Sequence, residues 1–222
     1  VLDRFRRNPI VGPGDIAMIL GPTDGLIGPT VSAATSERCG ALVVHGGRYD
    51  TATRLKMIAE LKPKIVSGTA SYLLHLVEVA PKHGVDLKAA GVKRLQSVGE
   101  PGAAVEATRR RLIDGWGCEI VSDGFGLTEI FPLGGSCPHS SDLHIASDVA
   151  LVEVVDPESG KPVAKGEAGE LVVSNLIGDT QPLLRYRTKD LVRLAADEAC
   201  TCGFTGARLA GGILGRIDDM IW

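Results

Sequence analysis

Residues 123–129 read Asp123-Gly124-Phe125-Gly126-Leu127-Thr128-Glu129 and directly follow an apolar run of strand type. The two glycines allow the backbone to turn sharply and to approach a ligand closely. The aromatic ring offers a flat face for a base, the hydroxyl can donate to a phosphate oxygen, and the carboxylate can hold a hard cation. The stretch therefore favours nucleotide chemistry. The alternative is an ordinary strand-to-helix connection whose Thr128 and Glu129 begin a helix.

Strand-like and helix-like segments alternate on the N-terminal side of this loop. The expected strands are Ile16 to Leu20, Ala41 to Val44, Lys64 to Val66, Lys93 to Val98 and Cys118 to Val121. The expected helices are Gly28 to Cys39, Thr51 to Leu61, Ala70 to Lys82 and Val105 to Ile113. The alternation predicts crossover units and an α/β fold with a mostly parallel sheet and flanking helices. Ligands of such sheets bind beyond the carboxyl ends of the strands, where the loops 97–102 and 123–129 are expected to lie.

The pattern changes after about Gly135. The expected strands there are Val149 to Val155, Glu170 to Ser174 and Leu183 to Asp190, the last continuing to Leu194. Short strands separated by turn residues predict a smaller antiparallel β subdomain. We therefore expect residues 1–136 to form an α/β nucleotide- and acyl-binding subdomain, and residues 137–222 to form a β subdomain.

Composition excludes several classes of protein. The chain has 222 residues, a net charge of −3 and 44% hydrophobic residues, which suits a soluble globular body. Basic residues do not cluster, so no nucleic-acid partner is expected. No apolar run reaches the roughly 18 residues of a membrane span, and the N-terminus lacks the apolar core of a signal peptide, which predicts no membrane partner and a cytoplasmic location. The chain starts without Met and stops inside an apolar run, so we expect a fragment.

Five cysteines are an odd number, so they cannot all form disulfides within one chain. Cys39 and Cys118 lie in a helix and a strand and are expected to be core thiols. Cys137, His144, Cys200 and Cys202 lie in turn-rich segments, the first two bracketing an expected loop from Pro138 to Leu143. A Cys3His set is an established closed zinc site, so these residues predict structural Zn²⁺. The alternative is a set of unligated thiols and a loop histidine.

Charged residues in the second half have two interpretations. Arg185, Arg187, Lys189 and Asp190 could form a solvated strand face, and Arg216, Asp218 and Asp219 could form a surface turn. Glu100 before Pro101 could simply mark the end of a strand. Their order along the chain favours a functional role over a purely structural one. The chain carries, in sequence, an acidic glycine loop, the loop 123–129, a strand end at 182–190 and a terminus at 215–219.

At these residues the chain resembles the adenylate-forming acyl-CoA synthetase family, and most closely its phenylacetate-coenzyme A ligases. The resemblance extends from Asp15 to Met220. Residues 125–129 match the Tyr-Gly-x-Ser/Thr-Glu motif, residues 182–190 match the strand with the ribose-binding aspartate, and residues 215–219 match the hinge. The family's phosphate loop would precede Val1, and its C-terminal lid would follow Trp222.

The resemblance implies a role for each matching residue. Phe125 stands where the family has tyrosine and would stack on adenine, and Gly99, in the loop Gly99-Glu100-Pro101, stands where alanine is usual. The implied nucleotide contacts are Gly99, Glu100, Pro101, Asp123, Gly124, Phe125, Asp190 for the ribose and Arg216 nearby. Thr128 would contact the phosphate and Glu129 would hold Mg²⁺. Asp218 would be the pivot of the lid.

The resemblance also implies the reaction. We expect ATP-dependent activation of an aryl or acyl carboxylate to acyl-AMP and transfer to coenzyme A, with Tyr72 and Phe131 lining the acid pocket. The implied cofactors are ATP/AMP, Mg²⁺ and coenzyme A, and the implied partners are a small carboxylic acid and a second copy of the chain in a homodimer. The alternatives are a non-catalytic nucleotide- or acyl-binding remnant and an adenylating enzyme that uses a carrier protein or an amine as acceptor.

Overall fold

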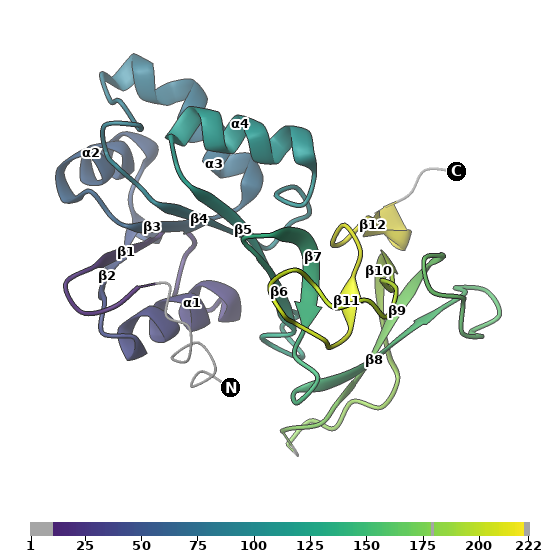
Figure 1. The fold of residues 1–222 in the computed structure, drawn as a ribbon. Helices are drawn as coiled ribbons and strands as arrows, with labels where there is room; N and C mark the ends of the chain where they lie inside the picture. Colours follow the sequence, from purple (N-terminus) through teal and green to yellow (C-terminus); the bar gives the residue numbers. More distant parts are fainter. Residues whose placement is uncertain (1–10, 179, 220–222) are drawn as a thin grey trace. The chain divides into compact units, whose positions relative to one another are not determined.

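The computed structural model describes residues 11–178 and 180–219. The chain divides into two compact units, one ending at Ser122 and the other beginning at Asp123. The first unit contains an α/β sheet with the strand order β2-β1-β3-β4-β5 (Figure 1). Its strands are β1 (Ile16–Ile19), β2 (Leu42–His45), β3 (Ile65–Gly68), β4 (Arg94–Val98) and β5 (Ile120–Phe125). The pairs β1–β2, β1–β3 and β3–β4 are parallel, which confirms the predicted fold class for this half.

Helices cover both faces of this sheet. They are α1 (Ile27–Arg38), α2 (Thr51–Leu61), α3 (Ala70–Val79) and α4 (Glu106–Trp116), with short 3₁₀ turns at Gly46–Arg48 and Ala80–His83. Figure 1 shows α2, α3 and α4 on one face and α1 on the other. The Asp50 side chain accepts from Thr53 N–H and caps α2. The α-helix predicted to reach Lys82 ends at Val79, because Pro81 removes a backbone donor and the chain tightens into a 3₁₀ turn.

The two faces of the sheet bury different cores. In register, Met18 lies beside Val66 and Ala17 lies beside Ile65. Met18 and Val66 belong to the larger core, together with Leu55 of α2, Leu73 of α3 and Leu112 of α4. Ala17 and Ile65 point to the opposite face and pack in a smaller cluster. Each fully buried Leu or Ile contributes about 1.5–3 kcal/mol, so the larger core dominates the stability of this unit.

The second unit begins with the end of β5. Its first sheet continues in the order β5-β6-β7-β11, with β6 (Gly134–Cys137), β7 (Ser140–Ile145) and β11 (Arg208–Leu209) all antiparallel to their neighbours. The expected loop from Pro138 to Leu143 is therefore wrong from Ser140 onward. A Cβ on Gly134 would lie 2.4 Å from the carbonyl oxygen of His144, so this strand pair needs glycine at its closest approach. The polar, glycine-rich sequence of β6 has no apolar alternation that would reveal a strand.

A separate four-stranded antiparallel sheet completes the second unit and confirms the predicted antiparallel part. Its order is β12-β10-β9-β8, with β8 (Ala150–Val155), β9 (Ala168–Asn175), β10 (Tyr186–Arg193) and β12 (Gly215–Arg216). The strand expected from Leu183 starts only at Tyr186. Leu183 N–H donates to the side chain of Asn175 over 2.7 Å instead of joining the ladder, and Arg185 has φ +48°. Both features interrupt an extended chain.

The core of the second unit joins residues of both its sheets. Leu133, Leu143 and Ile145 pack with Leu171 and Val192 in one cluster. The division by compactness falls inside β5, between Ser122 and Asp123. The assignment of residues 1–136 and 137–222 to separate functional subdomains stays a prediction.

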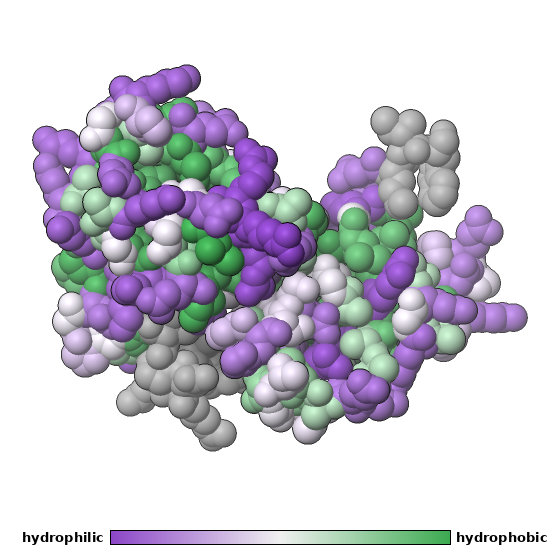
Figure 2. Space-filling view, turned by 45° about the horizontal axis from the view of Figure 1, so that its top comes forward, coloured by the Kyte–Doolittle hydropathy of each residue, from purple (hydrophilic) through white to green (hydrophobic). Residues whose placement is uncertain are grey.

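The surface is mixed in character. Figure 2 shows hydrophilic side chains over much of the visible face, with apolar patches between them. Across residues 11–178 and 180–219, no helix combines the length and apolar character needed to span a membrane. Leu184 is 84% exposed, but single exposed apolar side chains are normal on protein surfaces. The expected homodimer and cytoplasmic location stay predictions.

Candidate functional site

The loop after β5 is closed on itself by backbone hydrogen bonds. Leu127 N–H donates to Ile130 O over 3.0 Å, and Ile130 N–H donates back to Leu127 O over 3.1 Å. The Phe131 ring lies against Gly126, where a Cβ would come within 2.1 Å of Phe131 Cδ2. Residues 126–133 contain no helix. The alternative interpretation of this loop as the start of a helix is therefore wrong.

The predicted nucleotide-binding residues of this loop differ in burial. Asp123 is buried at the end of β5, and its N–H donates to Ser136 Oγ over 2.7 Å. Gly124 lies opposite β6 in the ladder, and the half-buried Phe125 packs against the core of the second unit. Thr128, by contrast, is exposed near the tip. The loop is thus anchored where it leaves β5 and accessible at its tip.

Glu129, also exposed at the tip, is connected to β10 by one side-chain contact. Tyr186 Oη donates to Glu129 Oε1 over 2.9 Å. The pKa of Tyr186 is raised, first because its hydroxyl donates to Glu129 and second because the ring is partly buried. The phenol therefore stays protonated at neutral pH, and it remains a hydrogen-bond donor to the carboxylate.

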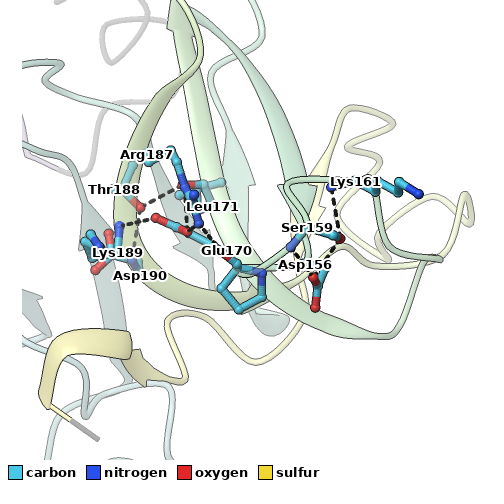
Figure 3. Close-up of polar contacts among 10 residues, drawn as sticks. Asp156, Ser159, Lys161, Glu170, Leu171, Arg187, Thr188, Lys189 and Asp190 are labelled. Atoms are coloured by element: carbon cyan, nitrogen blue, oxygen red, sulfur yellow. Dashed lines mark hydrogen bonds and ion pairs between the residues drawn. The ribbon is translucent and has the colours of Figure 1, made fainter.

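A bulge in β10 sets the position of Asp190. The register pairs on either side of it are Arg187 with Val172 and Leu191 with Glu170. The β10 residues between these pairs lie opposite Leu171 alone. Their backbone donors find side-chain acceptors instead of strand partners: Lys189 N–H donates to Glu170 Oε1 over 3.2 Å, and Asp190 N–H donates to Thr188 Oγ1 over 3.1 Å (Figure 3). The bulge is therefore a built feature with its polar groups satisfied.

Glu170 anchors the bulge through an ion pair with Arg187, whose own side chain is partly exposed. Its carboxylate is fully buried and accepts from Arg187 Nε over 2.8 Å, and Arg187 also donates to Pro157 O over 2.6 Å (Figure 3). The interpretation of these charges as a solvated strand face is wrong for Asp190, which is only 5% exposed. The buried Glu170 carboxylate depends on this arginine, because a buried charge that loses its partner is costly to the fold.

Lys189 occupies the bulge with φ +67°, a backbone region that favours glycine. Lys189→Gly is therefore expected to raise the free energy of unfolding by about 1 kcal/mol, because relief of the left-handed strain exceeds the added entropy of the unfolded chain. Chemical denaturation would measure the change. The control is Arg193→Gly, in the same strand but outside the positive-φ positions, which should lower the free energy of unfolding. Equal losses of this free energy in both variants would contradict strain at Lys189.

Asp190 carries a buried oxygen without a partner. Among the described residues, no group donates to its Oδ2, although Asp190 is nearly fully buried. Its other oxygen lies 3.6 Å from Arg216 Nη1. Burial raises the pKa of Asp190, and the Thr188 hydroxyl and Arg216 offset only part of this effect. A buried acceptor without a donor is costly to the fold, which indicates that a ligand supplies the donor.

Arg216 connects Asp190 with the predicted hinge. Its guanidinium donates to both carboxylate oxygens of Asp218, over 3.1 and 3.0 Å, within the 3₁₀ turn Ile217–Asp219. This interaction lowers the pKa of Asp218 and raises that of Arg216. The structure thus brings Asp190, Arg216 and Asp218 together. Their roles toward ribose and in a hinge stay predictions.

The first unit holds the other predicted contact loop. Gly99 has φ +89°, and the Glu100 carboxylate accepts from Ser71 N–H at the start of α3. Glu100 therefore caps a helix, and Pro101 follows it in the same turn. This contact is a structural role that the sequence did not predict. The nucleotide contact of residues 99–101 stays a prediction.

The two residues predicted to line the acid pocket have different surroundings. Tyr72 lies in α3, where its hydroxyl is 3.1 Å from Thr51 Oγ1 and the Arg54 guanidinium sits 5.0 Å above its ring. Phe131 lies in the second unit, against Gly126. Both side chains are half-buried. Their role in a pocket stays a prediction.

The four predicted metal ligands come together in the second unit. One ligand atom from each of Cys137, His144, Cys200 and Cys202 lies within 4.8 Å of the others. Cys137 Sγ and Cys200 Sγ are 3.8 Å apart, and Cys202 Sγ is 3.9 Å from His144 Nδ1. Zn–S bonds of about 2.3 Å give tetrahedral edges of about 3.8 Å, so these two separations match the edges of a closed tetrahedral site.

A network outside the four ligands orders the segment that carries Cys200. Arg208 donates to Glu198 O over 2.6 Å and pairs with Asp142 over 2.7 Å. The His144 and Phe204 rings stack with centroids 4.4 Å apart and planes 7° apart. The cysteine pair is thus held by β7 and β11.

Electrostatics at this cluster favour the metal-binding forms of His144 and Cys200 but not that of Cys137. Burial, followed by nearby Arg208, lowers the pKa of His144 and favours the neutral imidazole that binds metals. The Cys202 N–H donates to the Cys200 thiolate and lowers its pKa. Burial raises the pKa of Cys137. His144 Nε2 is buried and finds no hydrogen-bond partner in the described part of the chain.

Sequence reasoning missed three contacts around the predicted site residues. Glu170 holds the bulge, and Tyr186 holds the Glu129 carboxylate. Arg208 holds the segment that carries Cys200 and Cys202. For Tyr186 the sequence offered a signal, because this residue lies inside the motif at 182–190. For Glu170 and Arg208, isolated charges in strands gave no signal because their partners are distant in sequence.

Comparison with known proteins identifies the family. Residues 10–176 match the model of the AMP-binding enzyme family. The chain is 37% identical over 189 residues to a phenylacetate-coenzyme A ligase of Thermus thermophilus, covering 84% of this chain and 41% of that protein. It is 32% identical to the phenylacetate-coenzyme A ligase of Escherichia coli, covering 84% of this chain and 42% of that protein. The chain thus spans about two fifths of the length of these relatives.

Solved structures agree with this family. A 2-hydroxyisobutyryl-CoA ligase in complex with 2-HIB-AMP matches with a TM-score of 0.88 at 30% identity, covering 95% of this chain and 45% of that chain. An anthranilate CoA ligase matches at 20% identity, with a TM-score of 0.68 over 99% of this chain and 44% of that chain, which shows the fold alone. The motifs, the fold and the family match agree, and the chain belongs to the AMP-binding enzyme family.

Proposed function

We propose that this chain is the nucleotide-binding part of an enzyme that activates a carboxylic acid with ATP and transfers the acyl group to coenzyme A. The observation that carries this proposal is the buried, unpartnered Oδ2 of Asp190. Ribose hydroxyls would supply the missing donors, and Arg216, 3.6 Å away, would keep the carboxylate ionised. The family match and the relatives named as coenzyme A ligases support the same reaction.

The proposed chemistry needs binding and charge stabilisation instead of a side-chain nucleophile. A carboxylate oxygen of the substrate attacks the α-phosphorus of ATP and pyrophosphate leaves, forming acyl-AMP. The thiol of coenzyme A then attacks the acyl carbon and AMP leaves. Thr128 would donate to a phosphate oxygen, and Phe125 would stack on adenine with residues 99–101 and 123–124 along the base. Bound Mg²⁺ would offset charge on the phosphates, and the exposed Glu129 carboxylate would hold it.

The relatives support a class of acid and coenzyme A as the acceptor. Phenylacetate-coenzyme A ligases at 31–37% identity support an aryl-acetic or benzoic-type acid. The experiment is pyrophosphate exchange by the full-length enzyme with phenylacetate, benzoate and 2-hydroxyisobutyrate, followed by thioester formation with coenzyme A. Exchange without thioester would favour a carrier protein or an amine as the acceptor. No exchange with any acid, in protein that binds ATP, would favour a non-catalytic remnant.

The proposed role of Glu129 predicts a loss of adenylation on substitution. Glu129→Gln in the full-length enzyme should reduce acid-dependent pyrophosphate exchange by about tenfold or more, because shape is kept while the charge that holds Mg²⁺ is lost. The fold should be unchanged, since Glu129 is exposed. Exchange at limiting Mg²⁺ measures the effect, and Glu158→Gln, an exposed residue in the turn after β8, is the control. Wild-type exchange in Glu129→Gln would contradict the assignment.

The proposal also includes a structural zinc ion held by Cys137, His144, Cys200 and Cys202. The clustering of the four ligand atoms, with two separations close to a tetrahedral edge, supports it. With four protein ligands there would be no open position for substrate, so the ion would stabilise the second unit and take no part in the reaction.

A further inference from the structure

The side chain of Glu129 gains its orientation from a residue outside its own loop. The loop backbone is closed by the Leu127 and Ile130 hydrogen bonds, but these bonds leave the exposed carboxylate free to rotate. Among the described residues, its hydrogen-bond partner is the hydroxyl of Tyr186, 57 positions later in the chain. The contact uses Oε1 only. Orientation of the carboxylate therefore depends on β10.

Tyr186 is well placed to hold another side chain. It is the first residue of β10 and lies in register with Val173 of β9. The next residue, Arg187, is fixed by the buried Glu170 carboxylate. The Tyr186 ring is half-buried, so its hydroxyl has a defined position while its tip can still reach Glu129.

A neutral donor suits this position better than a charged one. The Tyr186 hydroxyl satisfies one oxygen of Glu129 without neutralising the carboxylate. A lysine or arginine there would pair with the carboxylate and compete with a cation. The same strand carries Asp190 within its bulge, so one strand would control both the cation-binding carboxylate and the ribose-binding carboxylate.

We infer that Tyr186 is a positioning residue that holds Glu129 by one oxygen and presents the other oxygen to the nucleotide-bound cation. This inference rests on the proposed role of Glu129. Groups that orient a metal-binding carboxylate typically change metal affinity or activity by about 10–100-fold when they are removed. A contact that served only to attach the loop to β10 would change stability and leave the cation dependence untouched.

The test is Tyr186→Phe in the full-length enzyme, assayed by pyrophosphate exchange over a series of Mg²⁺ concentrations. We expect the Mg²⁺ concentration for half-maximal exchange to rise by about tenfold, with most of the rate recovered at high Mg²⁺. Tyr49→Phe is the matched control, because Tyr49 is 48% exposed and lies outside the site. It should keep the wild-type Mg²⁺ dependence.

The double variant separates the inference from the proposed function. In the Glu129→Gln background, Tyr186→Phe should cause no further rise in the Mg²⁺ concentration for half-maximal exchange, because the two residues act through one carboxylate. An unchanged Mg²⁺ dependence in Tyr186→Phe, with Glu129→Gln impaired, would overturn the inference and leave the proposed function standing. Wild-type exchange in Glu129→Gln would overturn both the inference and the role of Glu129. A lower melting temperature with wild-type Mg²⁺ dependence would reduce Tyr186 to a structural contact and overturn the inference.

Discussion

Replacing Cys200 with serine is expected to abolish zinc binding and to lower the free energy of unfolding by about 3–5 kcal/mol. Cys200 lies 3.8 Å from Cys137, on the segment that also carries Cys202. Serine is a poor zinc ligand and leaves the remaining thiols without a common partner. For a chain of this size the melting temperature should fall by about 6–20 °C. Elemental analysis and thermal unfolding, with and without a chelator, measure the two effects.

The control for this prediction is Cys39→Ser, a half-buried cysteine in the first unit. That variant should keep close to one zinc per chain. Chelation should lower the melting temperature of the wild-type protein and of Cys39→Ser, but should have no further effect on Cys200→Ser. Metal-free wild-type protein, with thiols at Cys200 and Cys202 that react freely and no change on chelation, would rule out the site.

Asp190→Ala should weaken the binding of ATP by about 1–3 kcal/mol, because buried hydroxyl donors of the ribose would lose their acceptor. Calorimetric titration of the full-length enzyme measures this loss. Asp190→Asn keeps the shape and removes the charge, so it should also bind more weakly. Unchanged binding in a folded variant would remove Asp190 from the ribose site.

Asp190→Asn should stabilise the enzyme in the absence of nucleotide. Burial raises the pKa of Asp190 in the folded state, so folding is opposed by the anion above that pKa and favoured as pH falls through it. Asp190→Asn should therefore have a higher melting temperature than the wild type near neutral pH. The difference should shrink as the wild-type carboxyl becomes protonated at lower pH. Higher stability together with weaker binding would identify a carboxylate retained for its ligand.

Asp156→Asn is the control, for which we expect the opposite change in melting temperature. Asp156 is half-buried and accepts from Ser159 N–H and Oγ in a turn after β8, which lowers its pKa (Figure 3). Its contribution to stability is present at neutral pH and is lost as pH falls through the lowered pKa. Asp156→Asn should therefore lower the melting temperature near neutral pH and leave ATP binding unchanged. A gain in stability in both variants would contradict the explanation for Asp190.

The family and the motif positions could be found from sequence because both depend on local patterns. The helix Thr51–Leu61 was predicted with its observed bounds, since Asp50 provides a cap and the apolar spacing has a helical period. The motifs at 123–129 and 182–190 predicted which residues to examine. Boundaries failed where a non-local contact intervened, as at Leu183, whose N–H bonds to Asn175 instead of extending the strand.

By itself the sequence determined the parallel α/β half, the antiparallel second sheet and the identity of the candidate ligands, because periodicity and residue type encode them directly. Only the tertiary structure decided that Cys137 and Cys200, 63 positions apart, bring their sulfur atoms within 3.8 Å. It also decided that Tyr186 reaches Glu129 and that Glu170 builds the bulge that buries Asp190. The physical reason is that pairing between strands and between distant side chains is a property of the folded packing, and the local propensity of a segment does not specify its partner.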